Sequence, residues 1–169
     1  MADEKDIEID LEKDLRNLIF KLRNFVDSKK EADFEDKKLT SSFLKYFKNR
    51  VKMLEEEKYF EVPKGIVIKR GMVFWTDFGV NVGEEFGGKH PALVLRVGGK
   101  TAIVVPLSSK TPTDEQLKSG AYVEINKVYG LRAMTRWANV LNVQPVSIQR
   151  FDFESSFRNV KGYILDSLS

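Results

Sequence analysis

The chain has no cysteine and only one histidine among its 169 residues. Without cysteine there is no disulfide framework and no thiolate zinc site, which agrees with a reducing compartment, and one histidine excludes a metal site built from several. No apolar run approaches the roughly 18 residues that a membrane-spanning helix needs, and the first residues are acidic rather than a basic leader. We therefore expect a soluble, unprocessed, cytoplasmic protein with no membrane contact, no bound metal and no cofactor.

A large excess of charge of one sign is also missing, because the net charge is only +3. Residues 1–64 contain 15 basic and 16 acidic residues, whereas residues 65–169 contain 13 basic and 9 acidic ones. The basic surplus thus lies in the C-terminal part, with the sign that a phosphate-bearing partner requires. The surplus is too small to identify nucleic acid as that partner by itself.

Residues 1–62 have the pattern of two amphipathic helices. Leucines recur at helical spacing from position 11 to position 22, and a second helix is expected from about Ser41, an N-cap residue type, with residues 27–38 irregular between them. We predict an N-terminal helical hairpin that serves packing rather than catalysis. Its apolar stripes require a partner, which is each other, the following domain or a second chain.

From residue 63 to residue 169 the pattern is one of short strands and glycine-marked corners. A two-residue turn at Gly98-Gly99 predicts an antiparallel hairpin. The other expected elements are strands at 67–68, 72–75, 92–95, 101–105, 122–125 and 133–143, a loop at 106–120, a helical turn at 147–151, and a strand or helix at 163–168. The predicted fold class is α+β: a small, strongly bent antiparallel sheet or barrel preceded by the helical hairpin.

The glycine-rich, charged loop that leads into the strand at 92–95 is the strongest candidate for chemistry. Lys89 and His90 stand where the loop enters the strand, next to Pro91, which stiffens the chain. A cation and a titratable imidazole are thereby placed at a fixed point on a rigid element.

Four blocks of the sequence resemble, in order and spacing, the signature blocks of the MazF/PemK toxin family. The blocks are residues 70–77, 83–95, 102–109 and 138–151, and the resemblance covers about residues 65–168, with the N-terminal helices outside it. It implies a compact SH3-like barrel, usually a homodimer. It also implies a metal-independent endoribonuclease that cleaves single-stranded RNA and is silenced by an antitoxin protein.

The resemblance places the catalytic pair at His90 and Ser108, where the family usually has arginine and threonine. The nucleophile is the 2′-hydroxyl of the RNA, so the protein has to remove its proton, stabilise charge on the phosphate and protonate the leaving 5′-oxygen. Histidine is a poorer phosphate clamp than arginine but a competent proton shuttle, and Lys89 is expected to supply a fixed charge. The alternative is a structural or surface role for His90.

Further residues are expected to bind the substrate. Beside Ser108, the expected phosphate contacts are Ser109 and Lys110, although serines that end a strand are often only turn formers. On the loop, the residues suited to hydrogen-bond or stack on extruded bases are Asn81, Glu84, Glu85 and Phe86, with a mobile, solvated loop as the alternative. A basic-aromatic cluster that contacts either RNA or a second protomer consists of Arg132, Arg136 and Trp137.

Two functions of different classes remain open from the sequence. The first is an RNA-cleaving toxin centred on His90 and Ser108, and the second is a catalytically inactive module on the same barrel that binds RNA or protein with a regulatory or assembly role. A more distant third interpretation is a gyrase-poisoning toxin, since such toxins share this fold. The retained loop favours the first, and the replacements at positions 90 and 108 favour the second.

Overall fold

The computed structural model of the protein describes residues 9–83 and 85–155. Contacts divide the chain into two compact units, Met1–Lys48 and Asn49–Ser169. The domain boundary expected after residue 62 stays a prediction, and the element expected at 163–168 lies outside the described residues. None of the helices within the described ranges combines the length and the apolar character needed to cross a membrane.

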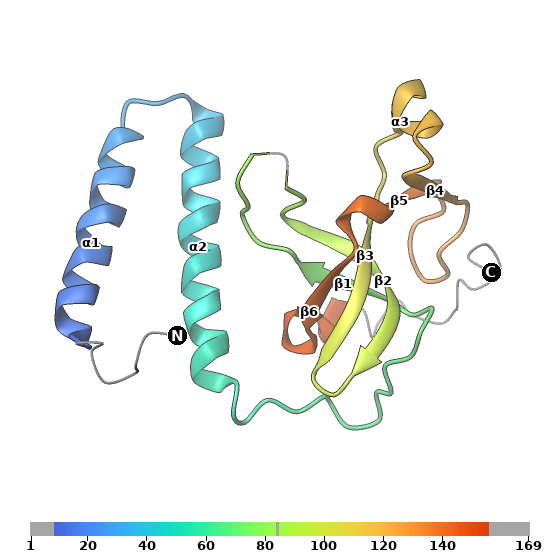
Figure 1. Cartoon of the computed structure of the whole chain (residues 1–169), viewed down its shortest axis with the longest axis horizontal. Helices are drawn as coiled ribbons and strands as arrows, with labels where there is room; N and C mark the ends of the chain where they lie inside the picture. The colour runs from blue at the N-terminus through green and yellow to red at the C-terminus, as the bar shows by residue number, and fades with distance from the viewer. Residues whose placement is uncertain (1–8, 84, 156–169) are drawn as a thin grey trace, which may run out of the picture. The chain divides into compact units, whose positions relative to one another are not determined.

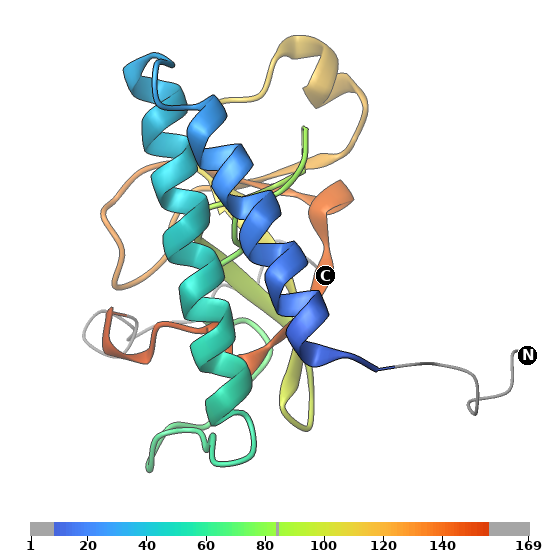
Figure 2. The same cartoon turned by 90° about the vertical axis from the view of Figure 1, so that its left-hand side faces the viewer.

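The N-terminal helices form an antiparallel hairpin, as expected (Figures 1 and 2). Helix α1 spans Leu11–Ser28 and helix α2 spans Phe34–Glu56. The two apolar stripes pack on each other through aromatic rings. Phe25 of α1 contacts Phe43 of α2 edge to face, with ring centroids 5.5 Å apart. Phe47 stacks on Phe43 one turn further along α2.

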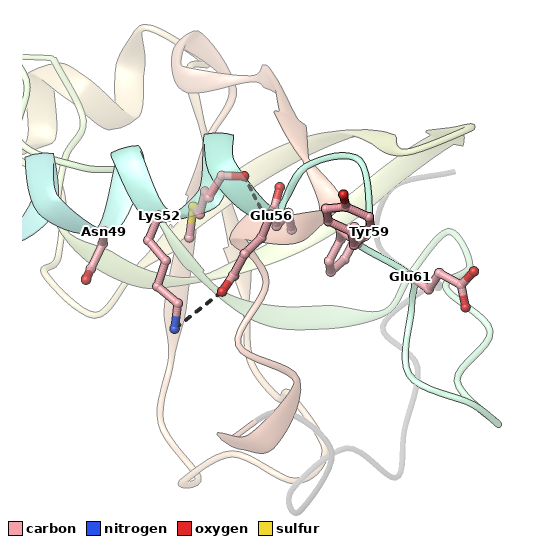
Figure 3. A pocket seen from close by; sticks show the side chains of 8 residues that line it. Asn49, Lys52, Glu56, Tyr59 and Glu61 are labelled. Atoms are coloured by element: carbon pink, nitrogen blue, oxygen red, sulfur yellow. Dashed lines mark hydrogen bonds and ion pairs between the residues drawn. The ribbon is translucent and has the colours of Figure 1, made fainter.

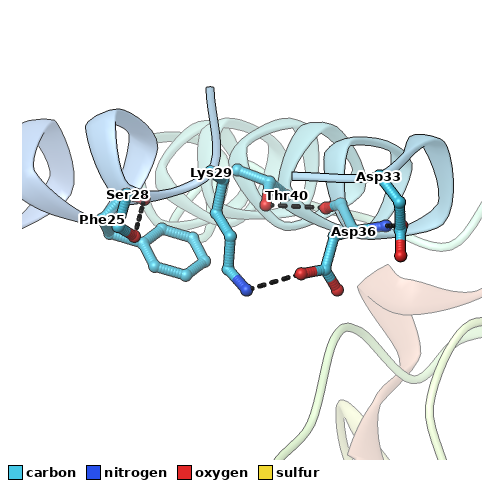
Figure 4. Close-up of polar contacts among 6 residues, drawn as sticks. All are labelled: Phe25, Ser28, Lys29, Asp33, Asp36 and Thr40. Carbon is cyan, nitrogen blue, oxygen red and sulfur yellow. Dashed lines mark hydrogen bonds and ion pairs between the residues drawn. The ribbon is translucent and has the colours of Figure 1, made fainter. Parts of the chain in front are cut away.

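The turn between the two helices is shorter than the sequence suggested. Helix α2 begins at Phe34 rather than at Ser41, because the carboxylate of Asp33 accepts a hydrogen bond of 2.8 Å from the backbone N–H of Asp36. Such a bond satisfies an N–H group that the first helical turn leaves without a partner. Lys29 then forms an ion pair of 2.8 Å with Asp36 across the turn (Figure 4).

The second unit is built on a six-stranded antiparallel sheet. Its strands are β1 (Val73–Asp77), β2 (Lys89–Gly98), β3 (Thr101–Ser108), β4 (Tyr122–Ile125), β5 (Arg136–Asn139) and β6 (Gln144–Ser147). Short helices among the described residues are α3 (Asp114–Lys118), η2 (Val140–Asn142) and η3 (Ile148–Arg150). The α+β fold class predicted from the sequence is thus confirmed.

Three local expectations were wrong. No strand forms at residues 67–68, and the single strand expected at 133–143 is interrupted by η2. The stretch 106–120 is not wholly irregular, since Thr113 and Gln116 form a capping box that starts α3.

Strand β3 lies at the centre of the sheet. Its one edge pairs with β2, and its other edge pairs first with β6, at Thr101–Val104, and then with β5, at Leu107 and Ser108. The segment from β5 through η2 to β6 therefore follows β3 along its length, and η2 accommodates the extra residues between the two pairings. β4 completes the order by pairing with β5.

The segment after β6 closes the sheet into a barrel. Phe151 bridges to Thr76 at the free edge of β1, and the N–H of Asp152 donates a bond of 2.8 Å to the carbonyl of Trp75. Phe151 also stacks on Phe74 with a centroid separation of 4.8 Å and an interplanar angle of 6°. Closure removes the open edge that a short sheet would otherwise present.

Two apolar clusters occupy the two faces of the barrel strands. The barrel cluster consists of Phe74, Phe78, Ala92, Val94, Ala102, Val104, Val146, Ile148 and Phe151. The outer cluster consists of Val73, Leu93, Val105, Leu107, Ile125, Val128 and Ala138. On β1, β2 and β3 neighbouring residues thus alternate between the two clusters, as the period of a strand requires.

The hairpin of β2 and β3 contains an irregularity that sets its register. The pair Gly98–Thr101 makes Gly99 and Lys100 the turn residues, one position later than expected, and Gly99 has a φ of +59°. Between Val94 and Arg96 the register shifts by one residue, which is a β-bulge.

An ion pair ties the start of β2 to the closing segment. The ammonium group of Lys89 contacts the carboxylate of Asp152, which also accepts a bond of 2.8 Å from the N–H of Ser155. Burial by itself would raise the pKa of Asp152, but the hydrogen bonds from Lys89 and Ser155 and the charge of Lys89 outweigh it and lower the pKa to about 2.

Replacing Phe151 by alanine is expected to destabilise the barrel by about 3–5 kcal/mol, the usual cost of removing a buried aromatic ring. Phe151 is only 4% exposed and its loss leaves a cavity against Phe74. Urea unfolding followed by tryptophan fluorescence measures this, because Trp75 and Trp137 both lie on barrel strands. The control Leu141→Ala, at a side chain 79% exposed, should change stability by less than about 0.5 kcal/mol. Equal stability of the two variants would contradict the closing role of Phe151.

The ion pair of Asp152 is expected to make stability depend on pH in a defined window. A carboxyl group with a depressed folded-state pKa stabilises the protein above its ordinary pKa and loses that contribution as pH falls toward the folded value. The stability difference between the protein and Asp152→Asn should therefore be full above about pH 4. It should shrink toward about pH 2. Urea unfolding of both proteins at a series of pH values tests this, and a difference constant over that window would refute it.

Candidate functional site

The loop between β1 and β2 is held closed at its base. The N–H of Phe78 donates to the carbonyl of Gly88 (2.8 Å) and the N–H of Gly88 donates to the carbonyl of Gly79 (2.6 Å), which extends the ladder of the two strands. A Cβ atom at Gly87 would lie 2.8 Å from the oxygen of Gly79, so the approach requires glycine there. His90 consequently has a well-defined position as the second residue of β2, opposite Thr76 of β1.

The imidazole of His90 is half-buried at the mouth of the barrel. It lies on the strand face of Ala92, which belongs to the barrel cluster, and its ring centroid is 4.6 Å from that of Phe86. Phe86 in turn packs edge to face on the buried Phe78, with centroids 5.4 Å apart. Burial lowers the pKa of His90 below its ordinary value, so the ring is neutral at pH 7.

Ser108 ends β3 on the same face as His90 of β2. The pairing of β2 with β3 ends at Ala92 and Pro106, and His90 and Ser108 lie two residues beyond that pair on their strands. Residues at opposite positions of an antiparallel pair point to the same face. The Oγ of Ser108 accepts a hydrogen bond of 3.0 Å from the N–H of Lys110, which is the turn-forming bond expected for a serine that ends a strand.

The β-bulge decides that Ser108 shares the face of His90. At the turn end of the hairpin Val97 pairs with Ala102, and this register without the bulge would place Leu107 opposite Ala92. A slip of one residue also reverses the face of each side chain. The extra residue at Leu95 therefore puts a hydroxyl and an imidazole on one face of the sheet.

The loop residues expected to bind bases have different surroundings from one another. Asn81 is exposed, and its amide donates a bond of 2.6 Å to the carbonyl of Phe86. Glu85 is exposed and accepts a bond of 3.4 Å from Val82. The ring of Phe86 is partly covered by Phe78 and His90, and Glu84 lies outside the described residues.

The other residues expected to contact the RNA have different surroundings. Lys89 is paired with Asp152, whereas Ser109, Lys110 and Arg132 are exposed. Arg136 is 6% exposed and its guanidinium donates a bond of 3.2 Å to the carbonyl of Met134. Burial lowers the pKa of Arg136.

The side chains of β5 alternate, so Arg136 and Trp137 point to opposite faces. Trp137 is paired with Ser108 of β3 and shares its face, while Arg136 is paired with Ile125 of the outer cluster. The structure therefore separates the basic-aromatic cluster that the sequence suggested.

Arg150 is a basic residue near the site that the sequence analysis did not single out. Its Nε donates a bond of 2.8 Å to the carbonyl of Asp77, which is paired with Lys89 at the start of β2. The only signal was its place in the last of the four sequence blocks, because nothing local distinguishes it from a surface arginine. It secures the C-terminal end of β1 beside His90.

A pocket of about 570 Å³ lies apart from these residues, between the last turns of α2 and Gln149 (Figure 3). The amide of Gln149 donates a bond of 2.9 Å to the carbonyl of Met53, and Lys52 forms an ion pair with Glu56 at its wall. None of the site residues expected from the sequence lines it.

Comparison with known proteins agrees with the resemblance of the four sequence blocks. The family model described as "PemK-like, MazF-like toxin of type II toxin-antitoxin system" matches residues 69–161, which is more than half of the chain. A crystal structure of MazF (Form-I) from Deinococcus radiodurans is similar over 55% of this chain and 89% of its own, with 17% sequence identity and a TM-score of 0.33. Among curated proteins no sequence matches the chain.

The matched region begins four residues before β1 and includes the loop, His90, Ser108 and the closing segment that completes the barrel. The two N-terminal helices lie outside it. The chain therefore belongs to the PemK-like, MazF-like family of toxins of type II toxin–antitoxin systems.

Proposed function

We propose that the protein is a toxin endoribonuclease that cleaves single-stranded RNA without a metal ion, through attack of an RNA 2′-hydroxyl on the adjacent phosphate. The observation that supports the proposal is a neutral imidazole on β2 and a hydroxyl on β3 on the same face, each two residues beyond the pair Ala92–Pro106. Family membership supplies the reaction class, and these two side chains supply groups that such a reaction uses.

His90 acts as the general base. Because burial keeps the ring neutral at pH 7, one ring nitrogen has a lone pair that can take the proton of the 2′-hydroxyl. The 2′-oxygen then bonds to phosphorus, the bond from phosphorus to the 5′-oxygen breaks, and the proton held by His90 reaches that oxygen through water. The products are a 2′,3′-cyclic phosphate and a 5′-hydroxyl end.

Ser108 orients the phosphate and stabilises charge on it. Its Oγ already accepts the N–H of Lys110, and this bond leaves the hydroxyl hydrogen for donation to a non-bridging phosphate oxygen. The exposed ammonium group of Lys110, two residues further along, adds a positive charge. The charge of Lys89 is largely offset by Asp152, so Lys89 is the weaker phosphate contact.

The remaining RNA contacts are proposed at the exposed residues Asn81, Glu85, Ser109 and Arg132. Glu84, which lies outside the described residues, stays a proposed contact from the sequence. Phe86 contributes mainly by covering one side of the His90 ring, and the buried Arg136 contributes least. An antitoxin protein and a second copy of the chain are the proposed protein partners, as in type II toxin systems of this family.

The competing hypothesis is a catalytically inactive module that binds RNA or protein. The observation in its favour is that the start of β2 has little net positive charge, because Lys89 is paired and His90 is neutral. The two experiments below separate it from the nuclease.

Replacing His90 by alanine is expected to lower the rate of RNA cleavage by about 10²–10⁴-fold, the usual contribution of a general base. Replacing Ser108 by alanine should lower it by about 10²-fold, the contribution of one donor to the charged phosphate. The measurement uses a long RNA in the presence of chelator, with mapping of the product ends. Thr101→Ala, at an exposed residue at the other end of β3, is the matched control and should cleave normally. No cleavage by the unaltered protein at any pH would favour the binding module.

The role of His90 as base, rather than as a phosphate clamp, gives a defined dependence on pH. A base with a lowered pKa is already deprotonated near neutrality, so kcat/KM should be level at and above about pH 6.5 and fall only in more acidic solution. A cationic clamp would give the opposite slope, with activity highest in acid. Single-turnover cleavage between pH 5 and 8 distinguishes the two, at constant ionic strength so that general screening does not change.

A further inference from the structure

The face that carries His90 and Ser108 continues across two more strands. Ser108 is paired with Trp137 of β5, and Trp137 is paired with Glu124 of β4. Because paired residues share a face, one row crosses β3, β5 and β4 in the order Ser108, Trp137, Glu124, with neighbouring strands about 4.8 Å apart, and His90 lies on the same face of β2. The half-buried indole and the exposed carboxylate are the two members of this row that the proposed chemistry does not use.

The two faces of the β4–β5 hairpin differ sharply. One face carries Val123, Ile125 and Ala138, which pack in or against the outer cluster. The other face carries the aromatic and polar side chains of Tyr122, Glu124, Trp137 and Asn139. A short antiparallel hairpin with one apolar face buried normally has a solvated polar face, so a large indole in that face needs an explanation.

Two of these four side chains are engaged with each other. The amide of Asn139 donates a bond of 3.1 Å to the hydroxyl of Tyr122, and its oxygen accepts the N–H of Leu141. These bonds anchor the end of the hairpin beside η2. Glu124 takes part in none of the ion pairs found within residues 9–83 and 85–155. Arg136, which precedes the pairing partner of Glu124 on β5, points to the opposite face.

We propose that Trp137 and Glu124 form a base-binding subsite next to the scissile phosphate. The indole provides a stacking surface for one unpaired base, and the carboxylate accepts a hydrogen bond from the exocyclic amino group of that base. The inference rests on the proposed function for its ligand, single-stranded RNA.

The chemistry of the subsite predicts which bases it selects. Stacking accepts every base, since each has a π face. A carboxylate is an acceptor only, so it favours cytosine, adenine and guanine, which carry an amino group. Uracil places a carbonyl oxygen on each side of its single N–H, and both repel the carboxylate. The subsite is therefore expected to discriminate against uracil.

The test uses short 2′-O-methyl oligoribonucleotides, which lack the nucleophile and cannot be cleaved. Fluorescence anisotropy of labelled oligomers gives affinity, and quenching of intrinsic fluorescence reports stacking on tryptophan. Trp137→Leu should weaken binding about 5- to 150-fold and lose most of the quenching, whereas Trp137→Phe, which keeps an aromatic ring, should bind nearly as the unaltered protein does. Tyr59→Leu, at an aromatic residue 83% exposed and outside the sheet, is the matched control.

Glu124→Gln is the test of base selection. The unaltered protein should bind oligomers of cytidine or adenosine about tenfold more tightly than oligouridine, and Glu124→Gln should remove that difference, because an amide can also donate to uracil. Glu57→Gln, at an exposed carboxylate directly after the last residue of α2, should leave the preference unchanged.

The outcomes separate this inference from the proposed function. Cleavage with unchanged binding and base preference in Trp137→Leu and Glu124→Gln overturns the subsite and leaves the nuclease. Binding that depends on both residues, without cleavage of ordinary RNA, overturns the nuclease and supports the subsite. Loss of self-association in Trp137→Leu without loss of oligomer binding, measured by sedimentation, shows that the indole is a protein interface and overturns the subsite.

Discussion

The register between β2 and β3 is the constraint on which the candidate site depends. Strand side chains alternate with a period of two, so one extra residue changes both the partner and the face of every residue beyond it. The bulge at Leu95 is that extra residue, and it puts the imidazole of His90 and the hydroxyl of Ser108 on the same face. The same register keeps Ala92 and Val94 in the barrel cluster. A one-residue shift of β2 against β3 would therefore disrupt the site and also turn these two side chains out of the core.

Barrel closure and site chemistry are coupled through the start of β2. The segment that brings Phe151 onto Phe74 also brings Asp152 to Lys89, and the resulting ion pair compensates the charge beside His90. With burial holding the ring neutral, a neutral imidazole stands where the family usually has a permanent cation. The replacement of arginine by histidine therefore changes the charge at this position as well as the size of the side chain.

Aromatic side chains have two separate uses in the barrel. Phe86 belongs to a loop, but its ring packs on Phe78 and against the ring of His90, which contributes to the desolvation of that imidazole. The aromatic surface available on the face of the site comes instead from Trp137 on β5. The loop residue Phe86 thus covers the imidazole, whereas Trp137 of β5 provides an aromatic surface on the face of the site.

The sequence by itself determined the local features: the two amphipathic helices, the β2–β3 hairpin, the glycine loop and the four blocks that identify the family. These depend on residues close together in the chain, so periodicity and turn chemistry reveal them. It misplaced the start of α2, because Asp33 outcompeted Ser41 as the cap, and it grouped Arg136 with Trp137, which alternation separates. Only the tertiary structure decided the bulged register, the burial of His90 and the pairing of Lys89 with Asp152, 63 positions away, because these result from packing between distant segments.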